Sequence, residues 1–134
     1  MKKILPDALK NKVAISSAGT HALHGHQAEA EAIKAMNLSG IDISLHRARK
    51  INKEIILRAN LILAMEKGHR RIIKNSFIFK RIKPRLLAEF GDDTDLIEIE
   101  DPYGQPLNVY LSCAEIMLPC LQGVLRSVQT AVLK

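Results

Sequence analysis

The chain has 134 residues, enough for one compact domain (residues 1–134) and too few for two. Apolar residues make up 47% of the sequence, as in a protein with a hydrophobic core, and no uninterrupted apolar run approaches the length of about 18 residues that indicates a membrane span. The net charge of +6 favours anionic partners. Two cysteines do not form the pattern of an extracellular disulfide framework, so we expect a cytoplasmic protein.

The first part of the chain predicts one strand and one helix after a helical start. Residues 1–10 resemble the end of a helix, and Val13–Ser16 is an apolar segment that predicts a short buried strand ending before Gly19. Apolar residues between positions 28 and 36 recur at helical spacing, and Gly40 is the expected stop of that helix.

Strands and helices continue to alternate in the second part. Asn52 is the expected N-cap of a short helix that ends at Leu57. Leu61–Met65 is a continuous apolar run, typical of a parallel strand covered on both faces, and a helix over 66–74 follows it. A last short strand is expected at Arg85–Leu87. The alternation predicts an α/β domain with a parallel sheet.

One long amphipathic helix is predicted from about residue 108 to the C-terminus. Its apolar positions recur every three or four residues, which favours burial of one face. The stripe consists of Cys113, Ile116, Met117, Cys120, Val124 and Val128.

Four motifs in order resemble the low-molecular-weight protein tyrosine phosphatases, most closely the bacterial type. They are Ser17-Ala18-Gly19-Thr20, the segment Gly40–Arg49, the segment Leu61–Glu66, and Asp101-Pro102-Tyr103-Gly104. The resemblance implies a hydrolase with a three-layer, parallel-sheet phosphatase fold. The family opens with a strand, a Cys-x5-Arg-Ser phosphate loop and a helix, and these elements would precede Met1. We therefore expect an N-terminally incomplete fold without the first strand, the phosphate loop and most of the first helix.

The resemblance also assigns roles at the active site. Family members hydrolyse phosphotyrosine through a cysteinyl-phosphate intermediate and need no cofactor or metal. Asp101 corresponds to the general acid that protonates the departing tyrosine oxygen, and Tyr103 to the residue that flanks the substrate ring. The chain contains no nucleophile in a phosphate-binding loop, so we expect it to be inactive alone.

Four further residues are assigned around the missing loop. Ser17 and His46 correspond to residues that support the phosphate loop through hydrogen bonds, and Leu23 and His24 to a wall of the substrate cleft. This agrees with a general property of open α/β sheets, whose ligands bind beyond the carboxyl ends of the strands.

Two patterns that look like sites have a simpler interpretation. Cys120 to Arg126 and the next serine spell Cys-x5-Arg-Ser, but they lie within the predicted C-terminal helix, where the backbone N–H groups are already bonded. Cys113 is too far along the same helix for a disulfide with Cys120. These cysteines are expected in the core. Buried cysteines in a helix also argue against an arsenate reductase, which has the same fold but uses additional reactive cysteines. The trio His21, His24 and His26 would offer a metal only three nitrogens, so we expect a polar loop there.

Basic clusters suggest the partner. They comprise Arg47, Arg49, Lys50 and Lys53; Lys67, His69, Arg70, Arg71 and Lys74; and Lys80, Arg81, Lys83 and Arg85. Few aromatic residues are interleaved with them, so we expect no nucleic acid partner. The lack of a long apolar run likewise leads us to expect no membrane. The resemblance implies a phosphotyrosine protein, such as a bacterial tyrosine autokinase of polysaccharide export. Alternatives are a non-catalytic protein that binds phosphorylated or acidic partners, and a basic nucleic-acid-binding domain. Unpaired strand edges also predict a dimer or a strand-swapped oligomer.

Overall fold

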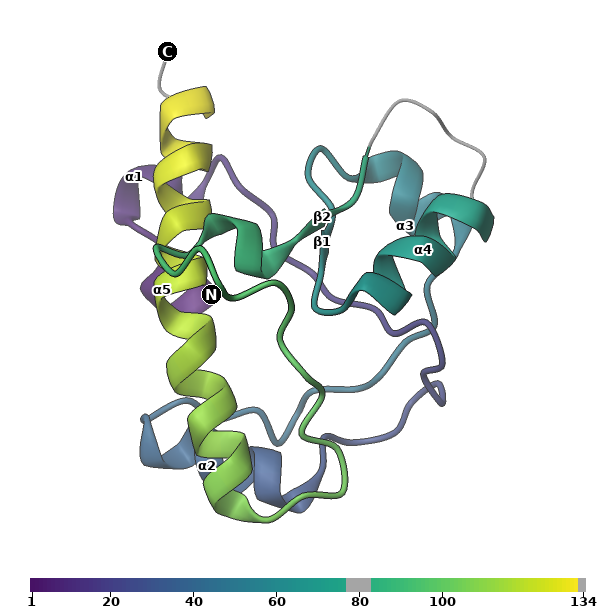
Figure 1. The fold of residues 1–134 in the computed structure, drawn as a ribbon, viewed down its shortest axis with the longest axis vertical. Helices are drawn as coiled ribbons and strands as arrows, with labels where there is room; N and C mark the ends of the chain where they lie inside the picture. Colours follow the sequence, from purple (N-terminus) through teal and green to yellow (C-terminus); the bar gives the residue numbers. More distant parts are fainter. Residues whose placement is uncertain (77–82, 133–134) are drawn as a thin grey trace.

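The computed structural model describes residues 1–76 and 83–132. The elements in chain order are η1 (Lys2–Ile4), α1 (Asp7–Lys10), α2 (Ala30–Leu38), α3 (Lys53–Arg58), β1 (Leu63–Ala64), α4 (Lys67–Ser76), β2 (Arg85–Leu86), η2 (Leu87–Phe90) and α5 (Leu107–Val132). β1 and β2 pair in parallel, so the expected α/β class is confirmed. The two strands lie between α5 with η2 on one side and α3 with α4 on the other (Figure 1). Of the third basic cluster, Lys80 and Arg81 lie outside the described residues.

Local capping explains where two of the helices begin or end. The Asn52 side chain accepts a hydrogen bond from the Ile55 amide at 2.9 Å, which caps α3 as predicted. Gly40 has a φ of +66°, and the amide of Ile41 reaches back to the Met36 carbonyl at 2.9 Å. This left-handed turn ends α2 at low steric cost because glycine has no Cβ.

The long helix α5 supplies the centre of the core. Cys120 and Val124 are 0% exposed and pack with Leu87, Ala88 and Ile99. Other residues of the predicted stripe pack around this cluster, but Ile116 is 43% exposed. Successive side chains of a helix differ by about 100° in direction, so Ile116 lies about 40° around the axis from Cys120, at the edge of the stripe.

By length and composition, α5 could also cross a membrane. Its 26 residues include an 18-residue window of mean hydropathy 1.2. The window arises although no long uninterrupted apolar run exists, because α5 contains two charged residues, Glu115 and Arg126, and its other polar positions are uncharged. In this structure the buried residues of α5, which are Cys120, Gly123, Val124 and Leu125, belong to the protein core.

Glu89 connects β2, η2 and α4. Its carboxylate accepts from Arg85 at 2.9 Å and from Arg70 at 3.0 Å, and the Leu86 amide donates to it at 3.1 Å. Burial alone raises the pKa of Glu89, but the hydrogen bonds from Arg85 and Leu86 and the charges of both arginines outweigh it and lower the pKa. The Arg85 guanidinium also stacks on Phe90, 4.1 Å from the ring centroid.

The predicted strand at Val13–Ser16 is wrong. The segment forms no strand, and Val13 and Ile15 instead pack against a small cluster around Leu9, which is 0% exposed. A strand exists only when a neighbouring strand supplies hydrogen bonds, and no strand of the described residues pairs with this segment.

Three other predicted boundaries differ in the structure. The run Leu61–Met65 contributes only the two residues of β1, because β2 pairs with it for only two residues. The last strand ends at Leu86, since the chain turns into η2 at Leu87. The helical start divides into η1 and α1, separated around Pro6, which lacks a backbone N–H and disfavours a helical conformation before it.

Candidate active site

A cavity of about 510 Å³ brings three predicted site residues together. Ser17, His46 and Asp101 come from three separate segments and all line it. Its other lining residues are Ala18, Gly19, Ala22, Ala48 and Arg49. The remaining predicted site residues lie elsewhere: Leu23, His24 and Tyr103 are exposed and do not line this cavity.

Backbone hydrogen bonds hold two walls of this cavity side by side. Gly19 donates to the Arg49 carbonyl at 2.9 Å, and Ile51 donates to the Gly19 carbonyl at 3.0 Å. Further along, the Ala48 amide donates to the His26 carbonyl at 2.8 Å. Two loops that lack regular structure are therefore joined by an isolated parallel bridge between Gly19 and Lys50 and by the bond between Ala48 and His26, and Ser17 and His46 on these loops line the same cavity.

The Arg49 side chain is a site residue that the sequence interpretation missed. Its Nε donates to the Ser17 carbonyl at 2.8 Å, and the side chain lines the cavity. Its position in the His46-Arg47-Ala48-Arg49 motif, next to an assigned residue, was the available signal. A guanidinium here can hold the Ser17 loop and also attract an anion in the cavity.

Asp101 opens a tight turn that directs its carboxylate. Its Oδ1 accepts a hydrogen bond from the Tyr103 amide at 3.0 Å, which is an Asx turn. The Gln105 amide donates to the Pro102 carbonyl at 2.9 Å, and Gly104 between them has a φ of +73°. The Asp-Pro-Tyr-Gly motif thus has a structural basis, since glycine adopts the positive φ readily.

Glu66 is a second residue that the sequence interpretation missed. Its Oε1 accepts from the Asp101 amide at 3.1 Å. Glu66 follows the predicted strand Leu61–Met65 directly, so the rule that sites form at the carboxyl ends of strands could have indicated it.

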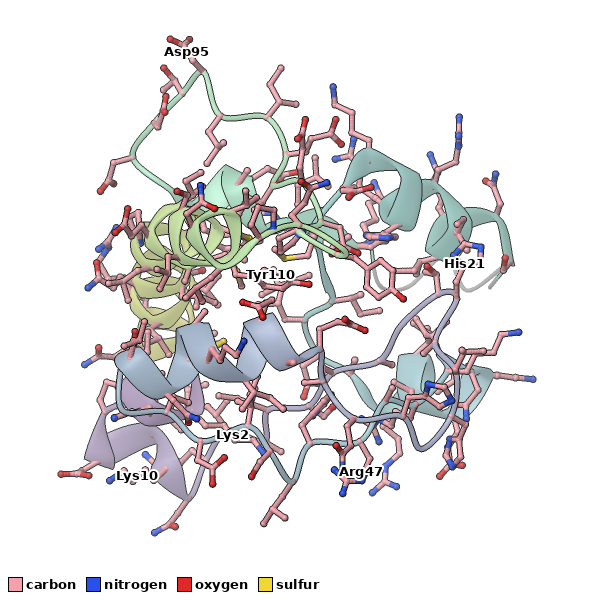
Figure 2. The ribbon with its side chains drawn as sticks, turned by 90° about the horizontal axis from the view of Figure 1, so that it is seen from below. Lys2, Lys10, His21, Arg47, Asp95 and Tyr110 are labelled. Atoms are coloured by element: carbon pink, nitrogen blue, oxygen red, sulfur yellow. The ribbon has the colours of Figure 1, made fainter. Side chains whose placement is uncertain are left out.

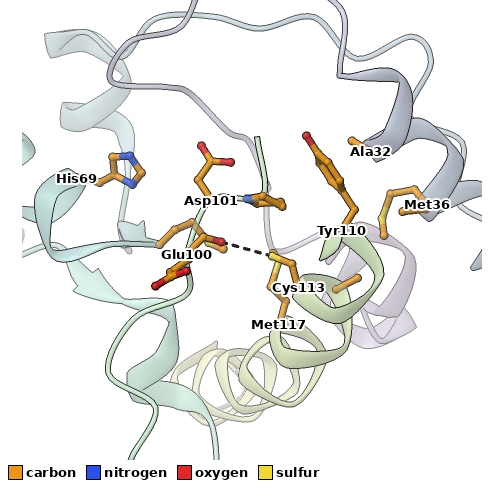
Figure 3. A pocket seen from close by; sticks show the side chains of 12 residues that line it. Ala32, Met36, His69, Glu100, Asp101, Tyr110, Cys113 and Met117 are labelled. Carbon is orange, nitrogen blue, oxygen red and sulfur yellow. Dashed lines mark hydrogen bonds between the residues drawn. The ribbon is translucent and has the colours of Figure 1, made fainter. Parts of the chain in front are cut away.

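Asp101 also lines a second, mostly apolar cavity of about 300 Å³. Figure 3 shows Asp101, Tyr110 and Met36 around it, with the Cys113 thiol donating to the Glu100 carbonyl at 3.8 Å. Burial raises the pKa of Cys113, and the charge of Asp101 adds to this; burial also raises the pKa of Tyr110. Both groups are therefore neutral near pH 7.

Cys120 lies within α5, as predicted. It is 0% exposed, and its thiol donates to the Ile116 carbonyl at 3.5 Å. Burial raises its pKa, and Arg126 forms an ion pair with Asp92 at 3.5 Å instead of facing the sulfur. The Cys-x5-Arg-Ser pattern in α5 therefore forms no anion-binding loop.

The three histidines of the 21–26 loop lie on the surface. His21 Nδ1 is 3.1 Å from Thr20 Oγ1. Within residues 1–76 and 83–132, no three His, Cys, Asp or Glu side chains converge in a way that could hold a metal ion. The absence of a cofactor stays a prediction.

Comparisons with known proteins identify the family. The sequence model of the family described as "Low molecular weight phosphotyrosine protein phosphatase" matches residues 1–132. A protein-arginine-phosphatase of Geobacillus stearothermophilus is 32% identical over 126 residues, which cover 91% of this chain and 84% of the relative. The probable tyrosine phosphatase EpsP of Ralstonia nicotianae is 32% identical over 105 residues, covering 78% of this chain and 70% of the relative.

Solved structures agree with this assignment. The low-molecular-weight tyrosine phosphatase of T. tengcongensis superposes with a TM-score of 0.76 at 34% identity, covering 84% of this chain and 76% of that one. The YwlE arginine phosphatase of G. stearothermophilus superposes with a TM-score of 0.82 at 31% identity, covering 91% and 78%. The chain therefore belongs to the low-molecular-weight phosphotyrosine protein phosphatase family.

Proposed function

We propose that the chain is the acid-bearing part of a phosphatase that hydrolyses phosphotyrosine through a cysteinyl-phosphate intermediate. The observation that carries the proposal is the cavity shared by Asp101, Ser17 and His46. A carboxyl group, a hydroxyl group and an imidazole beside one cavity are suited to phosphoryl transfer when a nucleophile is added.

On this proposal, neither cysteine of the chain is the nucleophile. Both cysteines lie in α5, and burial raises the pKa of each. A thiolate has to be stabilised by N–H groups and positive charge, and α5 offers neither at these sulfurs. The chain alone is therefore inactive, and a Cys-x5-Arg-Ser loop placed beside Asp101 completes the site.

The chemistry assigned to Asp101 is a proton transfer in each direction. As the thiolate sulfur bonds to phosphorus and the P–O bond breaks, protonated Asp101 gives its proton to the tyrosine oxygen. The resulting carboxylate then takes a proton from the water that attacks the cysteinyl phosphate, which releases phosphate and regenerates the thiolate. One carboxylate oxygen, Oδ1, is already occupied by the Tyr103 amide, so Oδ2 is the oxygen that carries the proton.

The other residues support the loop and the substrate. Ser17 and His46 hydrogen-bond the phosphate loop from behind, and Arg49 fixes the Ser17 carbonyl. Tyr103 is 69% exposed and Leu23 is 65% exposed; both lie free to contact a substrate ring, together with His24. The substrate is a phosphotyrosine protein, and a bacterial tyrosine autokinase of polysaccharide export is the partner that the sequence resemblance implies.

The names of the relatives indicate two different substrates, and these have different leaving groups. EpsP is named a tyrosine phosphatase, whereas the G. stearothermophilus relative is named an arginine phosphatase. The guanidinium ion has a higher pKa than a phenol, so a guanidine and a phenolate are both poor leaving groups that need a proton from an acid. Asp101 serves either substrate, so the assay has to offer both.

The test compares the 134 residues with a version extended by a strand and Cys-x5-Arg-Ser loop taken from the T. tengcongensis relative. We expect the unextended chain to match a buffer blank on p-nitrophenyl phosphate and the extended chain to hydrolyse phosphotyrosine peptides. Turnover by the unextended chain that Cys120→Ser abolishes would refute the assignment of the nucleophile. A folded but inert extended chain would refute the function, and a preference for phosphoarginine peptides would change the substrate class.

A second candidate is a non-catalytic protein that binds phosphorylated or acidic partners. The segments 17–28 and 43–53 around the polar cavity contain no Asp or Glu. Among the ion pairs of the described residues, none involves Arg47, Arg49 or Lys50. Figure 2 shows Arg47 on the same side of the molecule as His21, away from Asp95 in the loop between η2 and α5.

This candidate predicts binding without catalysis. The unextended chain should bind a phosphotyrosine peptide with acidic flanks more tightly than its unphosphorylated form, and salt should weaken the binding. The charge reversal Arg47→Glu should weaken it further, while Lys10→Glu, on the distant helix α1, should not. Equal binding of phosphorylated and unphosphorylated peptides would exclude recognition of the phosphate, and no binding of either peptide would exclude this function.

A further inference from the structure

The backbone of Asp101 is tied to the end of β1 by a side chain. Glu66 Oε1 accepts the hydrogen bond of the Asp101 amide at 3.1 Å, across 35 residues of sequence. Two residues earlier, the Ile99 amide donates to the Met65 carbonyl at 3.1 Å. The segment that leads to Asp101 therefore runs along the residues that follow β1 and is bonded to them.

A reciprocal bond strengthens this connection. The amide of Lys67, the first residue of α4, donates to Glu98 Oε2 at 2.8 Å. Each of the two segments thus gives a carboxylate to a backbone amide of the other. Ile99 between them is 3% exposed and packs in the main core, so the segment is fixed up to that residue.

Beyond Ile99, two bonds hold the peptide unit that joins Glu100 to Asp101: Glu66 accepts from the Asp101 amide at 3.1 Å, and the Cys113 thiol donates to the Glu100 carbonyl at the longer distance of 3.8 Å. The Asp101 side chain is exposed. Among the described residues, its hydrogen-bond partner is the Tyr103 amide, which donates to Oδ1 and belongs to the same turn. That bond shapes the turn without attaching it to the rest of the protein. The bond from Glu66 is the one that attaches Asp101 itself to the β1–α4 connection.

We propose that Glu66 is a positioning residue for the general acid. The proposal depends on the function proposed for Asp101, because positioning matters only if Asp101 transfers a proton. A general acid has to lie within about 2.6–3.2 Å of the oxygen that it protonates. A displacement of about 1 Å can cost on the order of 100-fold in rate, so a side chain that fixes the Asp101 backbone contributes to turnover without touching substrate.

The first test needs no catalysis and uses the 134-residue chain. Native-state hydrogen exchange measures the Asp101 amide in Glu66→Ala, Glu66→Gln and Glu98→Ala. Because one hydrogen bond is lost, Glu66→Ala should speed exchange at Asp101 by about 2- to 10-fold. Glu66→Gln retains an oxygen acceptor without the charge and should retain the protection. Glu98→Ala removes an equivalent bond between the same segments and should affect Lys67 but not Asp101.

The second test uses the extended, active chain and varies the leaving group. Glu66→Ala should lower kcat by about 10- to 100-fold on substrates with poor leaving groups, at nearly constant KM, and much less on p-nitrophenyl phosphate. Glu66→Gln should restore most of the rate. Glu98→Ala should show no dependence on the leaving group.

Either test can overturn the proposal. Unchanged Asp101 exchange in Glu66→Ala would show that the bond does not hold the turn. An equal rate loss on all leaving groups, or the same loss in Glu66→Gln as in Glu66→Ala, would show that Glu66 acts on folding or charge instead. If the extended chain is inert, the proposed function fails, and the exchange measurement still decides whether Glu66 fixes Asp101.

Discussion

Replacing Gly123 by alanine probes the contact on which the core of this protein depends. A Cβ at Gly123 in α5 would lie 1.8 Å from the Phe90 carbonyl oxygen of η2. To bring this distance to 3.0 Å, the helix or η2 must move by at least about 1.2 Å, and the obstacle is backbone that cannot rotate away. Overpacking of this kind costs about 1–3 kcal/mol, and a backbone clash belongs at the upper end.

Helix propensity acts in the opposite direction. Alanine is favoured over glycine within a helix by about 0.5–1 kcal/mol, so we expect Gly123→Ala to lower the free energy of unfolding by about 2 kcal/mol. With a urea slope of about 2 kcal/mol/M, the midpoint of urea unfolding followed by circular dichroism should fall by about 1 M.

Gly68 provides the matched control. It lies in α4, and a Cβ there would meet no atom within 4 Å. Gly68→Ala should therefore raise stability by up to about 1 kcal/mol through propensity alone. If Gly123→Ala were as stable as the unmodified chain while Gly68→Ala behaved as expected, the close packing of α5 on η2 would be refuted.

Further predictions concern catalysis, cysteine reactivity and pH. In the extended chain, Asp101→Asn should lower turnover of phosphotyrosine by about 10²–10⁴-fold and of p-nitrophenyl phosphate by less, because asparagine has no proton to give. Full activity of this variant in kinetic assays would refute the assignment of Asp101 as the general acid. Because burial raises the pKa of Cys113 and Cys120, iodoacetamide should label both cysteines slowly in the native chain and rapidly in urea. Mass spectrometry measures the labelling, and fast labelling of Cys120 in the native chain would contradict its burial. The pKa of Glu89 is lower in the folded protein than in the unfolded chain, where it is about 4.3. The ionised side chain therefore stabilises the fold above about pH 4.3, and this stabilisation is lost as the pH falls through the pKa of the folded state. Glu89→Gln should therefore cost about 1 kcal/mol at pH 7 and nothing at low pH in urea titrations, and an unchanged difference at both pH values would refute the role of its ion pairs.

The sequence by itself determined the helices, the α/β class and the family. The cap at Asn52 bonds an amide three residues away, and Gly40 ends α2 through bonds within one turn. Such signals are complete within a short segment, so they can be recognised without knowing what packs nearby. The order of four motifs identified the phosphatase family, since each motif is itself a short local segment.

Only the tertiary structure decided how the site is assembled. Glu66 bonds the Asp101 amide across 35 residues, and Arg49 bonds the Ser17 carbonyl across 32. The motifs can place Glu66 and Arg49 near the site, but they do not show which backbone atom each side chain bonds, because this depends on how β1 and the loops pack. The same reason explains Val13–Ser16, whose apolar pattern predicted a strand. A side-chain pattern reports which face of a segment can be buried, whereas a strand requires hydrogen bonds from a second segment, and only the folded chain determines whether that partner lies beside it.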